Sequence, residues 1–546
     1  MKKKLWYIFC FLILALIDWR RGSADGVTQL TFSYMTGAAV ALMMLPEVIK
    51  IWKLNLKNII GIIVAATLGV TFFMLGSPLL EYKGERATAA ISLGISLYLI
   101  FVYISCKGFK TFLISLKSPW YVLVIVLILL QTISRNDSLI CLYYFICFGA
   151  FTLYFREISD KEEFFMPILY GFIIWFFIQQ AFVFGFRPWD KSYYTGMYFG
   201  VTQNSMHYLM AFTACLLLSY FNKGKKFLSW FFFIVSGLLA CLTLMTGRKT
   251  AVIAEFFVVI VILLYGHYKE KMWGLRAFGK GCVILGITIL LFVPLYGALR
   301  YFPTILHHPI YFYNEYSDER SVRSFDSWDS TRYISFESAF DNTLGRYLRV
   351  LGLDVSLEYE DTTMDNAGTD TETITEETPK IEIPVEDLQI TNNMLTVQTE
   401  YDGATYVWLN NYLTSDPARE IIYAYYFENL NLLGHTKADG TFIQVDGLDE
   451  IPEGTVFTDM HNMFLEIFYR DGIPAGVIFL GLYVWMLVRS FRRAHSDKTE
   501  FIRLGFLIAM MIMGSFENVL NVGFMCLTMI VLLFATMDIS KPMRMR

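Results

Sequence analysis

The chain has 546 residues, of which 55% are hydrophobic and only 17% are charged, and its mean hydropathy is +0.47. Soluble domains carry about a quarter charged residues, so this composition excludes an ordinary soluble protein. The net charge of −4 hides an asymmetry, because residues 301–460 hold 30 of the 49 acidic residues and only 8 Lys or Arg, a local net charge of −22. That balance excludes a basic nucleic-acid-binding surface there, and nucleic acid is not expected as a partner.

Apolar runs long enough to cross a hydrocarbon core of about 30 Å recur along the chain. They predict an all-α polytopic membrane protein with about 14 transmembrane helices, in the range of 12 to 14. The expected spans lie near residues 4–18, 30–47, 58–77, 88–106, 119–135, 138–155, 163–186, 204–221, 227–246, 249–266, 278–299, 473–489, 501–516 and 521–538. The first run lacks a small-residue cleavage site after it, so we interpret it as a retained span and not a signal peptide.

This pattern divides the chain into three parts. Residues 1–300 hold the first 11 spans, residues 301–460 form one large loop, and residues 461–546 hold an amphipathic helix and the last three spans. If the N-terminus is cytoplasmic, 26 Lys and Arg fall on the cytoplasmic side and 9 on the outer side, with the remaining 10 in the 300–470 region. The positive-inside rule therefore predicts cytoplasmic termini and an extracytoplasmic loop.

The loop itself has two parts of different composition. Residues 354–388 are acidic, Thr-rich and poor in aromatic residues, which predicts a disordered insert. Between Tyr401 and Phe442, aromatic and aliphatic residues return at helical spacing, so we expect short helices that fold down over the membrane domain.

A charged interruption, Thr246-Gly247-Arg248-Lys249-Thr250, separates two apolar runs and predicts a very short external turn. Cations at a membrane interface often only reach toward lipid headgroups. An arginine fixed at the mouth of a helix bundle can instead bind a phosphate through two hydrogen bonds. Glu255 follows two helical turns later on the same face, inside the hydrocarbon region, where a carboxylate is either paired or functional.

Arginines in the loop are further candidates for phosphate binding. Arg419 lies in Ser415-Asp416-Pro417-Ala418-Arg419, before Leu432-Leu433-Gly434-His435. Taken alone it is more often a solvated charge on a helix face. Arg332, in Asp329-Ser330-Thr331-Arg332, is a second candidate for the same role.

The segment Asp459-Met460-His461-Asn462-Met463-Phe464-Leu465-Glu466 precedes the span at 473–489. Thr458 or Asp459 is the expected N-cap, which places His461 in the first turn of a short amphipathic helix. The positive end of the helix dipole favours the neutral imidazole, which can accept a proton. A lone histidine is usually an interface or capping residue, so His461 gains weight only from its context.

No pattern indicates a metal or a nucleotide cofactor. The pair His307-His308 has no carboxylate or cysteine at ligand spacing, and the acidic insert lacks a calcium-loop pattern. A Walker loop is also missing, so the sequence does not support ATP-driven transport. We therefore expect neither a cofactor nor a metal site.

Taken in order, these elements resemble the O-antigen ligase and polymerase superfamily over roughly residues 195–540. The resemblance consists of a Phe-Gly-x-x-x-Asn stretch ending at Asn204, the turn with Arg248, the large loop, the Arg419 helix leading into Leu-Leu-Gly-His, and the His461-Asn462-x-x-Leu-Glu element. It implies a multispanning, metal-independent glycosyltransferase on the outer face of the bacterial cytoplasmic membrane. Its substrate would be a glycan on undecaprenyl diphosphate, with a flippase and a chain-length regulator as candidate protein partners.

Within this resemblance, Arg248 and Arg419 match the diphosphate-binding arginines and His461 matches the catalytic histidine. Asn462, Glu466, Arg332, Asn204 and Glu255 are candidates for supporting roles. Polymerisation of lipid-linked repeats is the preferred activity, because no additional acceptor-binding domain is evident. Transfer of the glycan to another acceptor by a ligase, and transport of lipid-linked oligosaccharide by a flippase, stay open.

Overall fold

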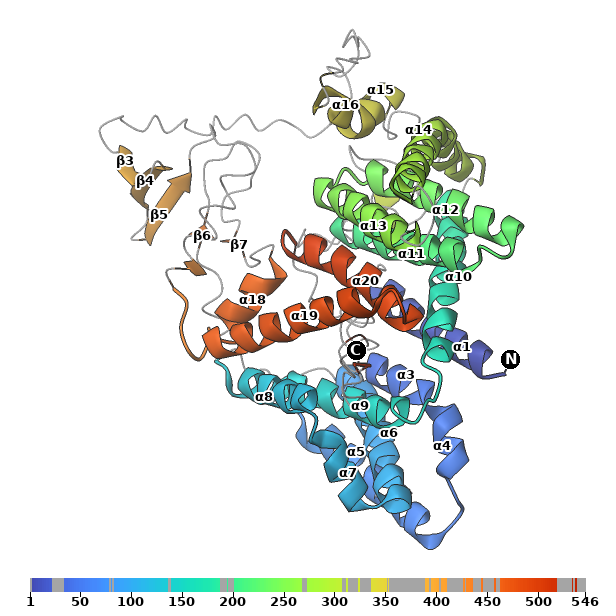
Figure 1. Cartoon of the computed structure of the whole chain (residues 1–546). Helices are drawn as coiled ribbons and strands as arrows, with labels where there is room; N and C mark the ends of the chain where they lie inside the picture. Colours follow the sequence, from blue (N-terminus) through green and yellow to red (C-terminus); the bar gives the residue numbers. More distant parts are fainter. Residues whose placement is uncertain are drawn as a thin grey trace.

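A computed structural model places the main helices of the chain (Figure 1). The structure describes residues 2–21, 34–77, 80, 83–135, 139–186, 194, 201–267, 273–306, 311–312, 323–324, 335–350, 352, 388–391, 394–401, 404–409, 426–427, 429–435, 443–444, 456–457, 462–517, 533 and 536–537.

The helices before the loop region are α1 (Lys2–Arg21), α3 (Met35–Met43), α4 (Leu45–Ile51), α5 (Leu56–Leu75), α6 (Lys83–Lys107), α7 (Phe109–Leu116), α8 (Pro119–Ile133), α9 (Leu139–Phe155), α10 (Glu162–Phe186), α11 (Val201–Phe221), α12 (Lys226–Met245), α13 (Lys249–His267) and α14 (Trp273–Leu306). Most of them are long, whereas α3, α4 and α7 are short. After the loop region come α18 (Met463–Arg470), α19 (Ile473–Arg493) and α20 (Lys498–Gly514).

Seven helices in the described part of the chain are long and apolar enough to cross a membrane. These spans are Leu56–Leu75, Lys83–Lys107, Glu162–Ala181, Lys226–Met245, Lys249–Gly266, Gly274–Phe302 and Ile473–Arg493. An eighth would be α7 with α8, which are bent by 84° at their junction. The protein is therefore a helical protein suited to a bilayer, whereas the expected number of fourteen spans is not confirmed.

The differences from the expected spans have simple causes. The predicted span at 30–47 falls on two short helices, α3 and α4, and α20 has only 17 residues. The last predicted span, 521–538, falls mostly outside the described residues. A run of apolar residues indicates that a helix is shielded from water. It does not distinguish a helix buried among other helices from one that faces lipid.

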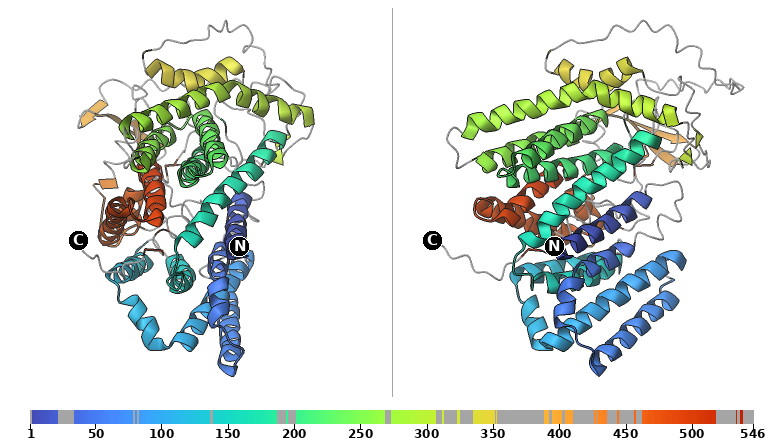
Figure 2. Two further views of the ribbon diagram at one scale, coloured as in Figure 1. Left: turned by 45° about the vertical axis from the view of Figure 1, so that its right-hand side comes forward. Right: turned by 90° about the vertical axis from the view of Figure 1, so that its right-hand side faces the viewer.

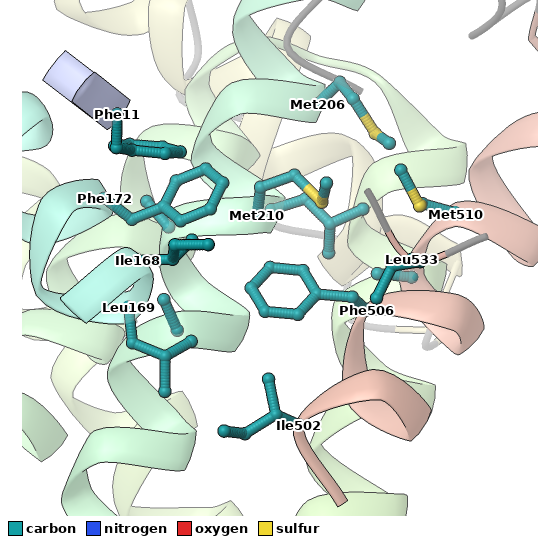
Figure 3. Packing of buried hydrophobic residues seen from close by; sticks show 14 of the residues in the cluster. Phe11, Ile168, Leu169, Phe172, Met206, Met210, Ile502, Phe506, Met510 and Leu533 are labelled. Atoms are coloured by element: carbon teal, nitrogen blue, oxygen red, sulfur yellow. The ribbon is translucent and has the colours of Figure 1, made fainter. Parts of the chain in front are cut away.

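Figure 2 shows the long helices stacked one above another with roughly aligned axes. Neighbours in the stack include the α11–α12 hairpin, α13 against α20, α1 against α10, and α18 against α19. Apolar residues of α1, α10, α11 and α20 meet in the interior (Figure 3), where the rings of Phe11 and Phe172 lie 4.7 Å apart and those of Phe172 and Phe506 lie 5.6 Å apart. This packing fixes the position of α20, and with it the turn that follows it.

The loop region adds small elements to the bundle. Helix α15 (Phe336–Phe340), a π-helical turn η2 (Asp341–Gly345) and α16 (Arg346–Val350) follow one another, and Phe336 packs on Phe292 and Tyr296 of α14. The strands form antiparallel pairs: β1 (Tyr311–Phe312) with β2 (Arg323–Ser324), β3 (Leu388–Thr391) with β4 (Met394–Tyr401), β4 with β5 (Ala404–Leu409), and β6 (Ile443–Gln444) with β7 (Val456–Phe457).

The expectation for the loop was wrong in one part. Helices were predicted from Tyr401 onward, but Tyr401 and residues 404–409 lie in strands. The run Ala404–Leu409 alternates Thr, Val and aromatic residues, which suits a strand better than a helix. The predicted insert at 354–388 lies outside the described residues except for Leu388, so its disorder stays a prediction.

Candidate functional site

Arg248 lies in a tight turn between two long helices. Helix α12 ends at Met245 and α13 begins at Lys249, as the sequence predicted. Gly247 adopts a φ of 67°, a left-handed conformation that glycine tolerates without strain. The carbonyl oxygen of Arg248 accepts the first hydrogen bond of α13, from the amide of Ala251 at 3.2 Å. Because a cation precedes the positive end of the α13 dipole, an anion at this position would be stabilised by both.

The guanidinium of Arg248 has a carboxylate partner that sequence reasoning missed. Its Nη1 donates to Oε1 of Glu517 at 3.4 Å, although the two residues are 269 positions apart. The side chain of Glu517 is 3% exposed, whereas that of Arg248 is 37% exposed. One signal was present in the sequence: Glu517 is a single carboxylate at the end of the apolar run of α20.

Asn462 begins the helix that follows the candidate base. Its Oδ1 accepts from the backbone amides of Phe464 at 3.0 Å and Leu465 at 3.1 Å, so Asn462 is the N-cap of α18. The predicted cap at Thr458 or Asp459 was therefore wrong, and His461 precedes the helix instead of lying in its first turn. An asparagine directly before an apolar helix is as good a cap as aspartate, but several polar residues compete in this segment. His461 itself lies outside the described residues.

The turn after α20 connects Asn462 to Arg248. Nδ2 of Asn462 donates to the carbonyl oxygen of Ser515 at 2.9 Å, and Glu517, two residues later, holds Arg248. At Gly514 an added Cβ would meet the side chain of Met463 at 2.8 Å, so α18 lies very close to the end of α20. The structure thus brings together the Arg248 turn and the residue next to His461, which are more than 200 positions apart in the chain.

Glu466 is already engaged by a neighbouring cation. It is buried on α18, and its Oε1 is paired with Nε of Arg470 one turn later. This pairing makes Glu466 a structural partner of Arg470 and weakens its candidacy as a proton acceptor.

Asn204 lies at the Arg248 end of the α11–α12 hairpin. At the opposite end, the Ser229 hydroxyl donates to the carbonyl oxygen of Ser219 at 2.8 Å, so the start of α11 lies beside the end of α12. Asn204 is fully buried there. It is thus placed at the same end of the hairpin as the Arg248 turn.

Glu255 lies deeper in the bundle than Arg248. Seven residues of α-helix span about 10 Å at 1.5 Å per residue. The side chain is 5% exposed, and among the described residues its Oε1 has no hydrogen-bond partner. The structure therefore confirms a buried carboxylate in α13 but does not bring it to the Arg248–Glu517 pair.

A second group of buried polar side chains lies between α10 and α11. Gln180 donates to the Tyr208 hydroxyl at 3.1 Å, and the ring of His207 lies 6.3 Å from that of Trp175. The amide of Gln179 is fully buried, and within the described part of the chain neither of its polar atoms has a hydrogen-bond partner. Sequence reasoning treated these residues as parts of apolar spans and missed them.

Residues 433–435 of the loop region contact the bundle. The His435 ring stacks on Tyr469 of α18 at 3.9 Å, and Gly434 lies so close to Arg470 that an added Cβ would be 2.0 Å from its carbonyl oxygen. The carbonyl oxygen of Leu433 accepts from the amide of Arg135, after α8. The Leu-Leu-Gly-His element is therefore a docking segment of the loop.

Both loop arginines lie outside the described residues. Arg419 is seven positions before the described Tyr426, and Arg332 is three positions before Ser335. Whether either approaches Arg248 stays a prediction.

Among the residues that the structure describes, no group of three or more His, Cys, Asp or Glu could hold a metal ion. The candidate site is thus an arginine, a buried glutamate and a capping asparagine at one end of a helical bundle. No protein-family model, curated protein or solved structure matches this chain.

Proposed function

We propose that this protein is a membrane glycosyltransferase that polymerises undecaprenyl-diphosphate-linked oligosaccharide repeats on the outer face of the bacterial cytoplasmic membrane. Its products would be a capsule, an exopolysaccharide or an O-antigen-type polysaccharide. The apolar helices suit a bilayer, and the sequence elements around Arg248 and His461 resemble those of O-antigen polymerases and ligases.

One observation carries the proposal. The turn after α20 holds Arg248 through Glu517 and holds Asn462, the neighbour of His461, through the Ser515 carbonyl group. Two elements that the resemblance assigns to one active site, although they are distant in sequence, therefore share a scaffold. If the resemblance of the Arg248 and His461 segments to the superfamily were accidental, there would be no reason for the Arg248 turn and Asn462 to contact the same turn after α20.

The proposed reaction needs little from the protein, because a lipid diphosphate is already a good leaving group. The acceptor hydroxyl oxygen forms a bond to the anomeric carbon while the bond from that carbon to the diphosphate oxygen breaks. The hydroxyl proton passes to His461, and the lipid diphosphate leaves with the electron pair. Attack in one step inverts the anomeric centre, and arginine stabilises the negative charge that grows on the leaving diphosphate.

In this proposal Arg248 is one arm of a diphosphate clamp and Arg419 is the other, with Arg332 as the alternative loop arm. More than a third of the Arg248 side chain is exposed, which leaves part of the guanidinium accessible to a ligand. The protein requires no metal in this mechanism, since arginine supplies the positive charge.

Transport of lipid-linked oligosaccharide is the second candidate function. Glu255 and Gln179 are buried polar residues within apolar helices, and among the described residues the Gln179 amide has no hydrogen-bond partner. An unsatisfied polar group costs several kcal/mol in a membrane interior. Such groups are typical of a transport path. A ligase would share the polymerase site and differ only in the acceptor.

The test compares Arg248→Lys with the neighbouring control Lys249→Ala in cells that lack the native protein. Lys249 is exposed and begins α13 directly after the turn. Polymerisation predicts that Arg248→Lys abolishes polymer and accumulates single lipid-linked repeats on the outer face, because lysine cannot form two parallel hydrogen bonds to phosphate. The control should make normal polymer.

A second variant separates chemistry from folding. Arg248→Ala would remove a cation from the buried Glu517 carboxylate, which destabilises the fold. The double variant Arg248→Ala/Glu517→Gln removes that penalty and should still make no polymer. Polymer from this folded double variant would contradict the proposed function. Repeats that accumulate on the inner face would favour transport.

A further inference from the structure

Glu517 is held more firmly than the arginine that it contacts. Its backbone amide donates to the Met513 carbonyl oxygen at 2.9 Å, which continues the α20 hydrogen-bond pattern. Two residues earlier, the Ser515 carbonyl oxygen accepts from Asn462. With a side chain that is 3% exposed, the carboxylate is a fixed point in the bundle.

Arg248, in contrast, is held at one point of its guanidinium. The bond to Glu517 uses Nη1, and among the described residues the buried Nε has no hydrogen-bond partner. The guanidinium carries five N–H donors in a planar fork. One edge is thus anchored while a third or more of the side chain stays exposed.

We propose that Glu517 is a positioning residue, which fixes the guanidinium of Arg248 relative to the start of α18 so that its free donors face the diphosphate. This inference rests on the proposed function. It adds that the three residues Ser515–Glu517 link the phosphate-binding arginine to Asn462 at the start of α18.

An alternative is that Glu517 pairs with Arg248 only until the substrate diphosphate replaces it. The geometry argues against this alternative. Such a carboxylate would have to move away when the diphosphate binds. Glu517 is buried, and the turn that carries it is bonded to α18 and packed against Met463. An anchored carboxylate keeps its bond to arginine and orients it throughout the reaction.

The experiment measures initial rates of repeat transfer by purified full-length protein, with lipid-linked repeats extracted from cells that lack this protein. Glu517→Gln keeps the side-chain shape but removes the charge. We expect kcat to fall by about 10- to 100-fold and KM to change little. This loss is smaller than the roughly 10²- to 10³-fold that follows removal of a whole oriented donor, because Arg248 stays in place and loses only its orientation. Glu517→Asp should recover part of the loss.

A double-mutant cycle tests whether Glu517 acts through Arg248. The variant Arg248→Lys/Glu517→Gln should be no slower than the worse single variant, since residues that act as a unit are not additive. The control is Glu162→Gln, which breaks the ion pair of 2.9 Å with Lys498 at the opposite end of the bundle and should leave kcat unchanged.

Three outcomes would overturn the inference: a normal kcat for Glu517→Gln, additive losses in the cycle, or a loss explained by a lower fraction of folded protein. The proposed function fails separately, if Arg248→Ala/Glu517→Gln still transfers repeats or if the wild-type protein transfers none. A normal kcat for Glu517→Gln together with an inactive Arg248→Lys variant would reject the positioning role of Glu517 and leave the proposed function standing.

Discussion

His461 is the residue on which the proposed chemistry depends most. Its role comes from the resemblance of its segment and from the position of Asn462, since His461 itself lies outside the described residues. The neutral imidazole stays a prediction. His461 precedes the Asn462 cap in the chain, and the positive end of the α18 dipole disfavours imidazolium nearby.

We expect His461→Gln to lower the rate of repeat transfer by about 10²- to 10⁴-fold, the usual contribution of a general base. Glutamine keeps hydrogen bonding but cannot take the acceptor proton. Accumulated single repeats in membranes and the initial rate of purified protein provide the measurement. His495→Gln is the control, because His495 stacks on Tyr265 between α19 and α20, at the end of the bundle away from Ser515. A His461→Gln rate near wild type would make this residue a positioning group.

At the scale of single elements, α18 depends on Asn462 for two different contacts. Asn462→Ala removes the cap and the bond to the Ser515 carbonyl oxygen. Cap removal alone costs about 0.5–2 kcal/mol of stability. The expected result is a lower unfolding temperature in detergent together with a lower transfer rate per folded molecule, because α18 loses its bond to the turn that holds Arg248.

Asp497→Ala is the matched control for that prediction. Asp497 caps α20 at the far end of the bundle, where its carboxylate accepts from the amide of Thr499 at 2.8 Å. It should lower the unfolding temperature to a similar extent and keep the rate per folded molecule. Equal effects of both variants on the rate would show that the α18–α20 contact has no functional role.

The docking segment of the loop yields a second prediction at this scale. Gly434 has a φ of 78° and faces the Arg470 carbonyl oxygen, whereas Gly108 has a φ of 85° with no atom near its Cβ position. Gly434→Ala should cost more stability than Gly108→Ala, which suffers only the backbone strain of about 1–2 kcal/mol. Thermal unfolding in detergent measures both, and equal losses would contradict the observed packing of the loop on α18.

At the scale of the whole molecule, the charge distribution predicts an extracytoplasmic loop and cytoplasmic termini. A cysteine at Thr371, in the loop, should react with an impermeant reagent in intact cells, and a cysteine at Ser496, between α19 and α20, should not. The background must lack Cys106 and Cys282, which are exposed. Equal labelling at both positions would reject this orientation, and with it the proposed location of the site.

The acidic insert gives the other prediction for the whole molecule. Its composition cannot bury enough apolar surface to offset the entropy cost of ordering. Replacement of residues 358–385 by a short Gly/Ser linker should therefore leave the protein inserted and polymer synthesis intact. Loss of polymer by a well-inserted deletion variant would indicate that the insert binds glycan or a chain-length regulator.

The sequence by itself determined the protein class. Composition and apolar runs predicted helices suited to a bilayer, and the structure has seven such helices among its described residues. The turn at Arg248 was also predictable, because two adjacent charged residues between two apolar runs indicate a break between two helices. These features depend on local composition and periodicity, which can be read directly from the amino-acid sequence.

Only the tertiary structure decided which helices are long and apolar enough to cross a membrane as single spans and which residues meet. Glu517 reaches Arg248, and Asn462 reaches Ser515, because α20 packs against α13 and α18 adjoins its end. A contact between residues that are about 50 to 270 positions apart produces no periodic pattern in a single sequence. The cap of α18 was missed for a related reason: several polar residues can cap a helix, and the bond from Asn462 to the neighbouring turn is a contact that local sequence does not reveal.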